Sequence, residues 1–164
     1  GPVDRDAAID ALRRTSADGG RPMDADAAEA AADISRGYPY LIQLVGSLAW
    51  ARASLDDGPA ITSADVSDIR DRAIDRMGAQ VHRPSLRGVP DGERIVLDAM
   101  ARLMAESGED AVATGDIAAE LGLTPQGLSP RRARLIEREL VRAPKYGHLA
   151  FALPYLGEHL LSGG

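Results

Sequence analysis

Basic side chains in the last third of the sequence are the first candidates for binding chemistry. Residues 128–145 hold six basic and two acidic side chains, a local charge of +4 in a chain whose net charge is −6. On a helical wheel Arg131, Arg134 and Arg138 share one side, as expected for a helix that lies on the phosphate backbone of DNA. The candidate DNA-binding residues are therefore Arg131, Arg132, Arg134, Arg138 and Lys145.

The same arginines have a second explanation. Leu135 lies near the arginine side of the wheel, and if Leu135 belongs to the core, part of the arginine stripe turns inward or sideways. Of the 19 lysine and arginine residues only Lys145 is a lysine, so a coding bias toward arginine would also produce an arginine-rich face in contact with solvent. The sequence leaves DNA contact and a solvated face open.

Catalytic patterns are missing from the sequence. Its only lysine is followed by Tyr146, so there is no Gly-Lys-Ser/Thr loop for nucleotide phosphates. Without cysteine there is no thiol nucleophile and no thiolate metal site. His82, His148 and His159 lack metal-ligand spacing, and His159 is expected on the solvated side of the last helix. The chain by itself is expected to be catalytically silent, with no cofactor and no metal.

A tight corner is predicted at residues 36–43, Arg-Gly-Tyr-Pro-Tyr-Leu-Ile-Gln. Gly37 follows an alanine-rich helix and should have a positive φ, where a side chain costs about 1 kcal/mol. Pro39 suits the first turn of the next helix, because that turn needs no N–H donor from it. The residues alone thus predict a corner between two packed helices.

Four helices are expected before residue 82, at about 4–15, 24–37, 39–54 and 62–80. The third has almost no polar face, so it should lie at the centre of the first domain. Thr62 and Asp65 resemble a capping box at the start of the fourth. A composition with 45% hydrophobic but only 4% aromatic residues favours close-packed helices. Residues 1–82 are predicted to form a helical domain, and residues 83–90, with two prolines and a glycine, a linker.

Residues 91–164 have a different pattern. Helices are expected from residue 91, over 114–122 and over about 129–139, followed by short strands at about 141–144 and 148–153 and a last helix from Pro154. In the first of these helices, Ile95, Val96, Ala99 and Leu103 should face inward. Three helices followed by a β-hairpin make a winged helix. The predicted fold class is therefore mainly α, a four-helix bundle followed by a winged-helix domain with a small β-hairpin wing.

Several motifs, in this order, resemble a family of ATPases. Pro2 and Asp4, Gly37-Tyr-Pro-Tyr-x-x-Gln43, Gly46 and Ala49-Trp50 are similar to the lid of the STAND class of P-loop ATPases, relatives of the AAA+ and origin-recognition ATPases. The similar group is bacterial, mostly from high-G+C genomes. Ser129-Pro-Arg-Arg-Ala-Arg-Leu-Ile136 and Gly147-His-Leu-Ala-Phe-Ala-Leu-Pro154 resemble the winged helix that follows their lid. The resemblance covers nearly the whole chain, and it implies that the four-helix bundle is a lid.

The resemblance also implies a role for the corner. In that class the proline of Gly-x-Pro packs on the adenine of a nucleotide that the P-loop domain holds. Pro39 matches this proline, so Gly37, Tyr38 and Pro39 become the candidate nucleotide-contacting residues. Tyr40 stands about where initiator-type lids carry an arginine that reaches the γ-phosphate. This lid is therefore expected to sense the nucleotide through the adenine.

Under this resemblance the chain is the C-terminal regulatory part of a larger ATPase switch. A missing N-terminal P-loop domain would bind ATP or ADP with Mg²⁺, and the winged helix would dock on double-stranded DNA, on a protein partner or on the ATPase core. Gly1-Pro2 in place of a methionine is expected of a tag remnant or of native sequence inside a longer polypeptide.

The alternative from another class of protein is a free-standing winged-helix transcription regulator whose N-terminal helices dimerise. Neither a signal peptide nor an apolar stretch of membrane length is present, so no membrane partner and a cytoplasmic location are expected.

Overall fold

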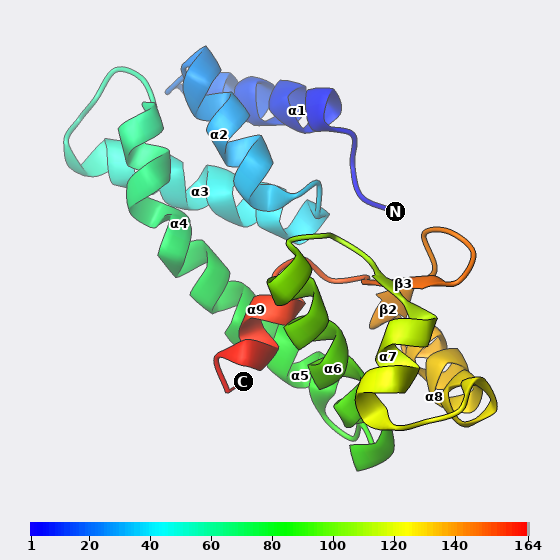
Figure 1. Cartoon of the computed structure of the whole chain (residues 1–164). Helices are drawn as coiled ribbons and strands as arrows, with labels where there is room; N and C mark the ends of the chain where they lie inside the picture. Colours follow the sequence, from blue (N-terminus) through cyan, green and yellow to red (C-terminus); the bar gives the residue numbers. More distant parts are fainter. Residues whose placement is uncertain (164) are drawn as a thin grey trace. The chain divides into compact units, whose positions relative to one another are not determined.

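A computed structural model of the chain describes residues 1–163. The chain divides into two compact units, Gly1–Met77 and the part from Gly78 onward. Most of the described residues are helical, and they include one small antiparallel sheet, in the second unit (Figure 1). The prediction of a mainly α protein is confirmed.

The first unit consists of four helices, which are α1 (Arg5–Asp18), α2 (Ala25–Ser35), α3 (Pro39–Leu55) and α4 (Ser63–Met77). The predicted capping box opens α4: the Asp65 carboxylate accepts from the Thr62 N–H at 2.9 Å, and the Thr62 hydroxyl accepts from the Asp65 N–H at 3.3 Å. These two bonds satisfy backbone donors that the first turn of a helix leaves without partners.

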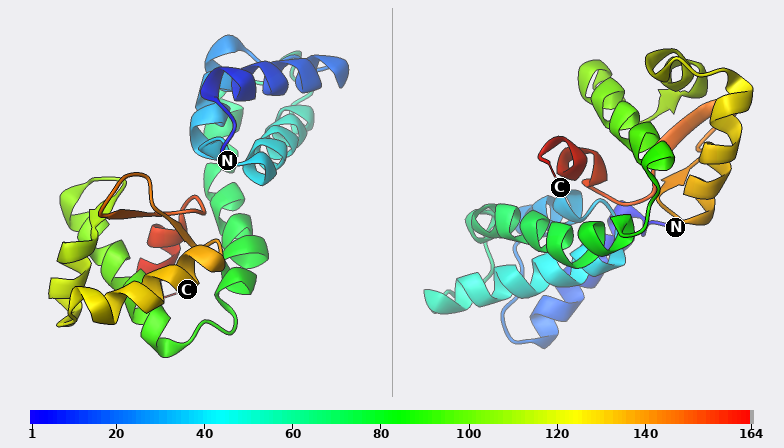
Figure 2. Two further views of the ribbon diagram at one scale, coloured as in Figure 1. Left: turned by 90° about the vertical axis from the view of Figure 1, so that its right-hand side faces the viewer. Right: turned by 90° about the horizontal axis from the view of Figure 1, so that it is seen from below.

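Alanine dominates the core of the first unit. Ala27, Ala28 and Ala31 of α2 are completely buried, as are Val45 and Ala49 of α3. Short side chains let the helix axes approach closely, and α3 and α4 pack along each other (Figure 2). As predicted for a central helix, α3 contacts the other three helices, but it also has an exposed face that includes Gln43, Ser47 and Ala51, and Leu55 at its end is 81% exposed. The composition, rich in alanine and poor in aromatic residues, is thus the composition that this packing requires.

The second unit begins with a π-helical turn, η1 (Gly78–His82), and a short helix, α5 (Arg83–Leu86). Then follow α6 (Asp91–Ser107), β1 (Val112–Ala113), α7 (Thr114–Leu121), α8 (Pro125–Glu137), β2 (Val141–Arg142), β3 (His148–Phe151) and α9 (Leu156–Leu161). The strand order is β1-β3-β2, with both pairs antiparallel. This order of elements is compatible with the predicted winged helix, and β1 is an addition to it.

Several boundaries differ from the sequence-based expectation. The helix expected from about Ser129 begins at Pro125, because the Thr124 hydroxyl caps it by accepting from the Gly127 N–H at 3.0 Å. Residues 83–90, predicted as a linker, include α5, whose Leu86 is buried in the core of the second unit. Ile95, predicted to face inward, is 42% exposed, whereas the neighbouring Val96 and Leu97 are buried.

Candidate functional site

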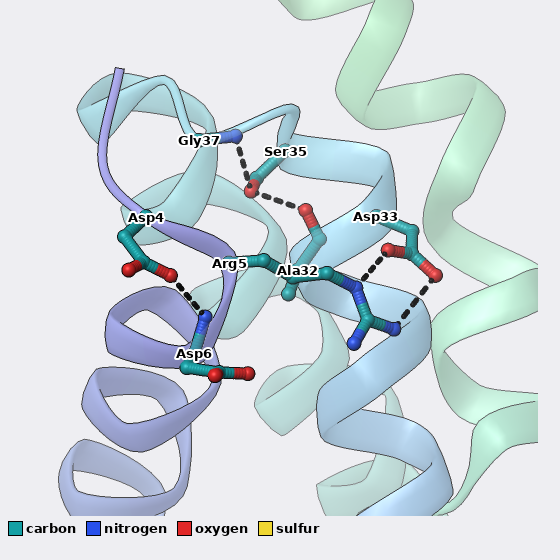
Figure 3. A network of polar contacts seen from close by, with 7 residues as sticks. All are labelled: Asp4, Arg5, Asp6, Ala32, Asp33, Ser35 and Gly37. Carbon is teal, nitrogen blue, oxygen red and sulfur yellow. Dashed lines mark hydrogen bonds and ion pairs between the residues drawn. The ribbon is translucent and has the colours of Figure 1, made fainter. Parts of the chain in front are cut away.

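The backbone at residues 35–38 reverses the chain between α2 and α3. Arg36 (φ 48°) and Gly37 (φ 73°) are both left-handed, and Tyr38 returns to an extended conformation. The buried Ser35 hydroxyl donates to the Ala32 carbonyl at 2.7 Å and accepts from the Gly37 N–H at 3.2 Å (Figure 3). The positive φ predicted for Gly37 is confirmed, and the Ser35 bonds hold the corner in this shape.

Pro39 is exposed to solvent at the first position of α3. The half-buried rings of Tyr38 and Tyr40 lie in edge-to-face contact, with 6.4 Å between their centroids. Two of the candidate nucleotide-contacting residues, Tyr38 and Pro39, thus present ring surfaces next to the buried Gly37. A proline ring on a rigid corner beside aromatic rings is suited to pack on the flat face of a base.

The segment that precedes α1 binds directly to this corner. The Val3 N–H donates to the Gly37 carbonyl at 2.7 Å. The Arg5 guanidinium makes two bonds to the Asp33 carboxylate, at 2.8 and 3.3 Å (Figure 3). This hydrogen bonding lowers the pKa of the Asp33 carboxyl below its ordinary value. Sequence patterns of helix periodicity and capping give no signal for either contact, because they compare residues only a few positions apart.

The arginine stripe of α8 faces the first turn of α6. Arg131 donates to the Gly92 carbonyl at 2.9 Å. The Nε atoms of Arg134 and Arg138 each lie 3.4 Å from a carboxylate oxygen of Glu93, whose side chain is only 3% exposed. The structure therefore places two of the candidate DNA-binding residues against a buried acid, and a third against the backbone carbonyl of the preceding residue. DNA contact by these three residues stays a prediction.

Leu135 explains this orientation. It is completely buried in the core of the second unit, so the arginines beside it on the wheel turn toward α6. The two remaining candidates lie elsewhere: Arg132 is half-buried on α8, and Lys145 is exposed in the turn between β2 and β3, next to Tyr146, which is 102% exposed. The only sequence signal at Glu93 is its position in the first turn of a helix. The helix dipole favours any acidic residue there, so this position does not indicate an ion pair with another helix.

A buried and a half-buried histidine lie in ring contact in the second unit. His82 is 1% exposed; its Nε2 donates to the Pro154 carbonyl at 2.7 Å, and its ring centroid lies 4.8 Å from that of His159. Burial lowers the pKa of both histidines below the ordinary value. The expectation that His159 lies on the solvated side of α9 is wrong, because α9 packs this side against η1 and α6. No group of three potential metal ligands occurs within residues 1–163.

Gly46 and Trp50, two further residues of the lid-like motif, border a hollow of about 220 Å³ between α1 and α3. A Cβ on Gly46 would lie 3.1 Å from a methyl carbon of Leu12, so glycine permits the close approach of α1 to α3. The Arg21 guanidinium lies 4.8 Å from the centroid of Trp50 and donates to the Gly58 carbonyl at 2.7 Å. These contacts give the two motif residues structural roles in the first unit.

The chain belongs to a family described as a domain of unknown function, DUF8462, whose model matches residues 79–160, half of the chain. No curated protein matches the sequence. None of the helices within residues 1–163 is long and apolar enough to cross a membrane.

Two solved structures are among those that match the chain. The RuvB Holliday junction branch migration motor of Thermotoga maritima has a TM-score of 0.43 and 16% identity, and the match covers 98% of this chain and 49% of RuvB. Cdc6p of Pyrobaculum aerophilum has a TM-score of 0.44 and 18% identity, over 98% of this chain and 47% of Cdc6p. The chain thus spans about half the length of these proteins.

Proposed function

We propose that this chain is the nucleotide-sensing lid and the winged-helix domain of a STAND/AAA+-type P-loop ATPase, in which it acts as the regulatory part of a switch. The observation that carries the proposal is Pro39, exposed on a corner that two left-handed residues and the Ser35 bonds hold rigid. The phosphates of ATP or ADP, with Mg²⁺, would be held by a P-loop domain in the preceding polypeptide. Such a switch would work in the cytoplasm.

The test uses the polypeptide that joins this chain to its P-loop domain. Pro39→Ala should weaken ADP and ATP binding by a similar factor, because the contact to the base is common to both nucleotides. Affinities are measured with fluorescent nucleotide analogues, and Pro59→Ala, at an exposed proline of the α3–α4 loop, is the matched control. Unchanged affinities in Pro39→Ala, or a loss for ATP alone, would contradict the adenine contact. An open reading frame without a P-loop would favour the free-standing transcription regulator.

We further propose that the winged helix docks on double-stranded DNA. In the described part of the chain, no ion pair involves Arg132, Arg142 or Lys145, and the last two are exposed on the hairpin. These side chains are therefore available for phosphates, whereas Arg134 and Arg138 already have Glu93 as a counter-ion. Docking on a protein partner or on the ATPase core is the competing possibility.

Fluorescence anisotropy with a labelled duplex at several salt concentrations tests this docking. Each phosphate contact contributes roughly −0.9 to the slope of log K against log salt. Alanine at Arg132, Arg142 and Lys145 together should therefore flatten the slope by about two to three units. Alanine at Arg70, Arg72 and Arg76, exposed on α4, removes the same charge and should leave the slope unchanged. Absence of binding at low salt, or equal effects of the two triple variants, would favour a protein-docking role.

A further inference from the structure

The contact between Val3 and Gly37 is a close approach of two backbones. The Val3 N–H donates to the Gly37 carbonyl at 2.7 Å, and a Cβ built on Gly37 would overlap the Val3 carbonyl oxygen. The same added Cβ on Gly37 would also lie 3.2 Å from the Cβ atom of Pro2. Residues 2–4, which we call the arm, therefore lie directly against the residue at the centre of the corner.

A second contact ties the start of α1 to the end of α2. Arg5 binds the two carboxylate oxygens of Asp33 with its Nε and Nη2 atoms, a bidentate geometry that fixes the direction as well as the distance between the two helices. The side chains are 51% and 61% exposed, so the pair adds little to the free energy of folding. Its effect is to hold the start of α1, and with it the arm, at a fixed position beside the last turn of α2.

Gly37 lies two residues before Pro39, and Tyr38 between them packs its ring against that of Tyr40. A displacement of the arm would therefore pull on the Gly37 carbonyl and move the start of α3. We infer that the arm, with Arg5 and Asp33, is the positioning element of the corner: it holds Pro39 in place for the nucleotide and carries to Pro39 any movement of the polypeptide before it. This inference rests on the proposed nucleotide contact.

The contact itself is tested on this chain by amide hydrogen exchange. The Val3 amide should exchange at least roughly tenfold more slowly than in an unstructured peptide, because its N–H is bonded to Gly37. Gly37→Ala should abolish this protection while the Val45 amide in the middle of α3 stays protected. Exchange of Val3 at the unstructured rate in the unchanged chain would overturn the inference.

The positioning role is tested in the polypeptide that includes the P-loop domain. Arg5→Asp and Asp33→Arg each place like charges together, so each should weaken nucleotide binding about two- to fivefold with little change in melting temperature. The double variant restores opposite charges and should restore the affinity. Arg14→Asp, which disrupts the more exposed Arg14–Asp10 pair within α1, should leave affinity unchanged.

The outcomes separate the inference from the proposed function. If Pro39→Ala weakens nucleotide binding but Arg5→Asp and Asp33→Arg do not, the positioning role is wrong and the nucleotide contact stands. If the single variants lose affinity and the double variant does not recover it, the Arg5–Asp33 pair is not the cause, and the positioning role is again wrong. If Pro39→Ala has no effect, the nucleotide contact is wrong and the positioning role falls with it.

Discussion

Two independent constraints meet at Gly37. Its φ of 73° is costly for any residue with a Cβ, and the Val3 carbonyl occupies the place where that Cβ would lie. Gly37→Val should therefore lower the free energy of unfolding of the first unit by about 2–4 kcal/mol. Gly20→Val is the matched control, because Gly20 has a φ of 85° but an open environment, so only about 1–2 kcal/mol should be lost.

Urea denaturation followed by the fluorescence of Trp50, the single tryptophan of the chain, measures both losses in the first unit. Equal losses in Gly37→Val and Gly20→Val would mean that the approach of Val3 to Gly37 imposes no constraint.

His82 makes the stability of the second unit depend on pH. Burial lowers its pKa first and His159 adds to this, whereas the bond to the Pro154 carbonyl and the charge of Glu158 act in the opposite direction. Burial also lowers the pKa of His159, and the charges of Arg83 and Arg94 lower it further. Because both pKa values are lower in the folded state, the unfolded chain binds more protons as pH falls below the ordinary value of 6.5.

The contribution of the two neutral histidines to the free energy of unfolding should therefore be fully present above pH 6.5. It should decrease as the pH falls toward the lowered pKa values. His82→Gln keeps a donor for the Pro154 carbonyl but does not titrate, so it should reduce this decrease. Unfolding followed by circular dichroism from pH 5 to 8 measures the effect, and a pH-independent stability in the unchanged chain would contradict it.

At the level of secondary-structure elements, Glu93 links α6 to α8 through two ion pairs. A buried carboxylate is tolerated only when it is paired, and Arg134 and Arg138 supply that pairing. Alanine at both arginines would leave the charge buried and unpaired. Because the arginines are themselves 54% and 37% exposed, the loss should be about 2–3 kcal/mol, below the usual range for fully buried pairs.

Adding Glu93→Gln to the double arginine variant should recover part of this stability, because it removes the unpaired charge. Urea denaturation followed by circular dichroism gives the three free energies. If the double arginine variant is as stable as the unchanged chain, the ion pairs with Glu93 do not stabilise the packing of α8 on α6, and the arginines form a solvated face.

On the scale of the whole molecule, the chain lacks the groups that hold a nucleotide's phosphates. The sequence has no Gly-Lys-Ser/Thr loop, and packing of adenine on Pro39 supplies only a small part of the usual affinity. The chain alone should therefore neither hydrolyse ATP nor bind it tightly, and calorimetry at micromolar concentrations should detect no binding. Micromolar affinity in this chain would contradict the assignment of phosphate binding to a separate domain.

The sequence by itself determined the features that depend on neighbours a few residues apart. The Thr62–Asp65 capping box, the start of α3 at Pro39 and the positive φ of Gly37 all follow from local conformational preference. The same rules gave a late start for α8, near Ser129, whereas the Thr124 cap and Pro125 begin the helix four residues earlier. Local rules thus fixed most helices and the existence of the corner.

Only the tertiary structure decided which groups far apart in sequence meet. Arg134 and Arg138 face Glu93 because the burial of Leu135 sets the rotation of α8, and a helical wheel shows relative directions without showing which side is covered. His159 is paired with His82 because α9 packs back on η1, and Val3 reaches Gly37 because α1 lies beside α2. Capping and periodicity act within one or two turns, whereas burial is set by whichever segment arrives from elsewhere in the chain.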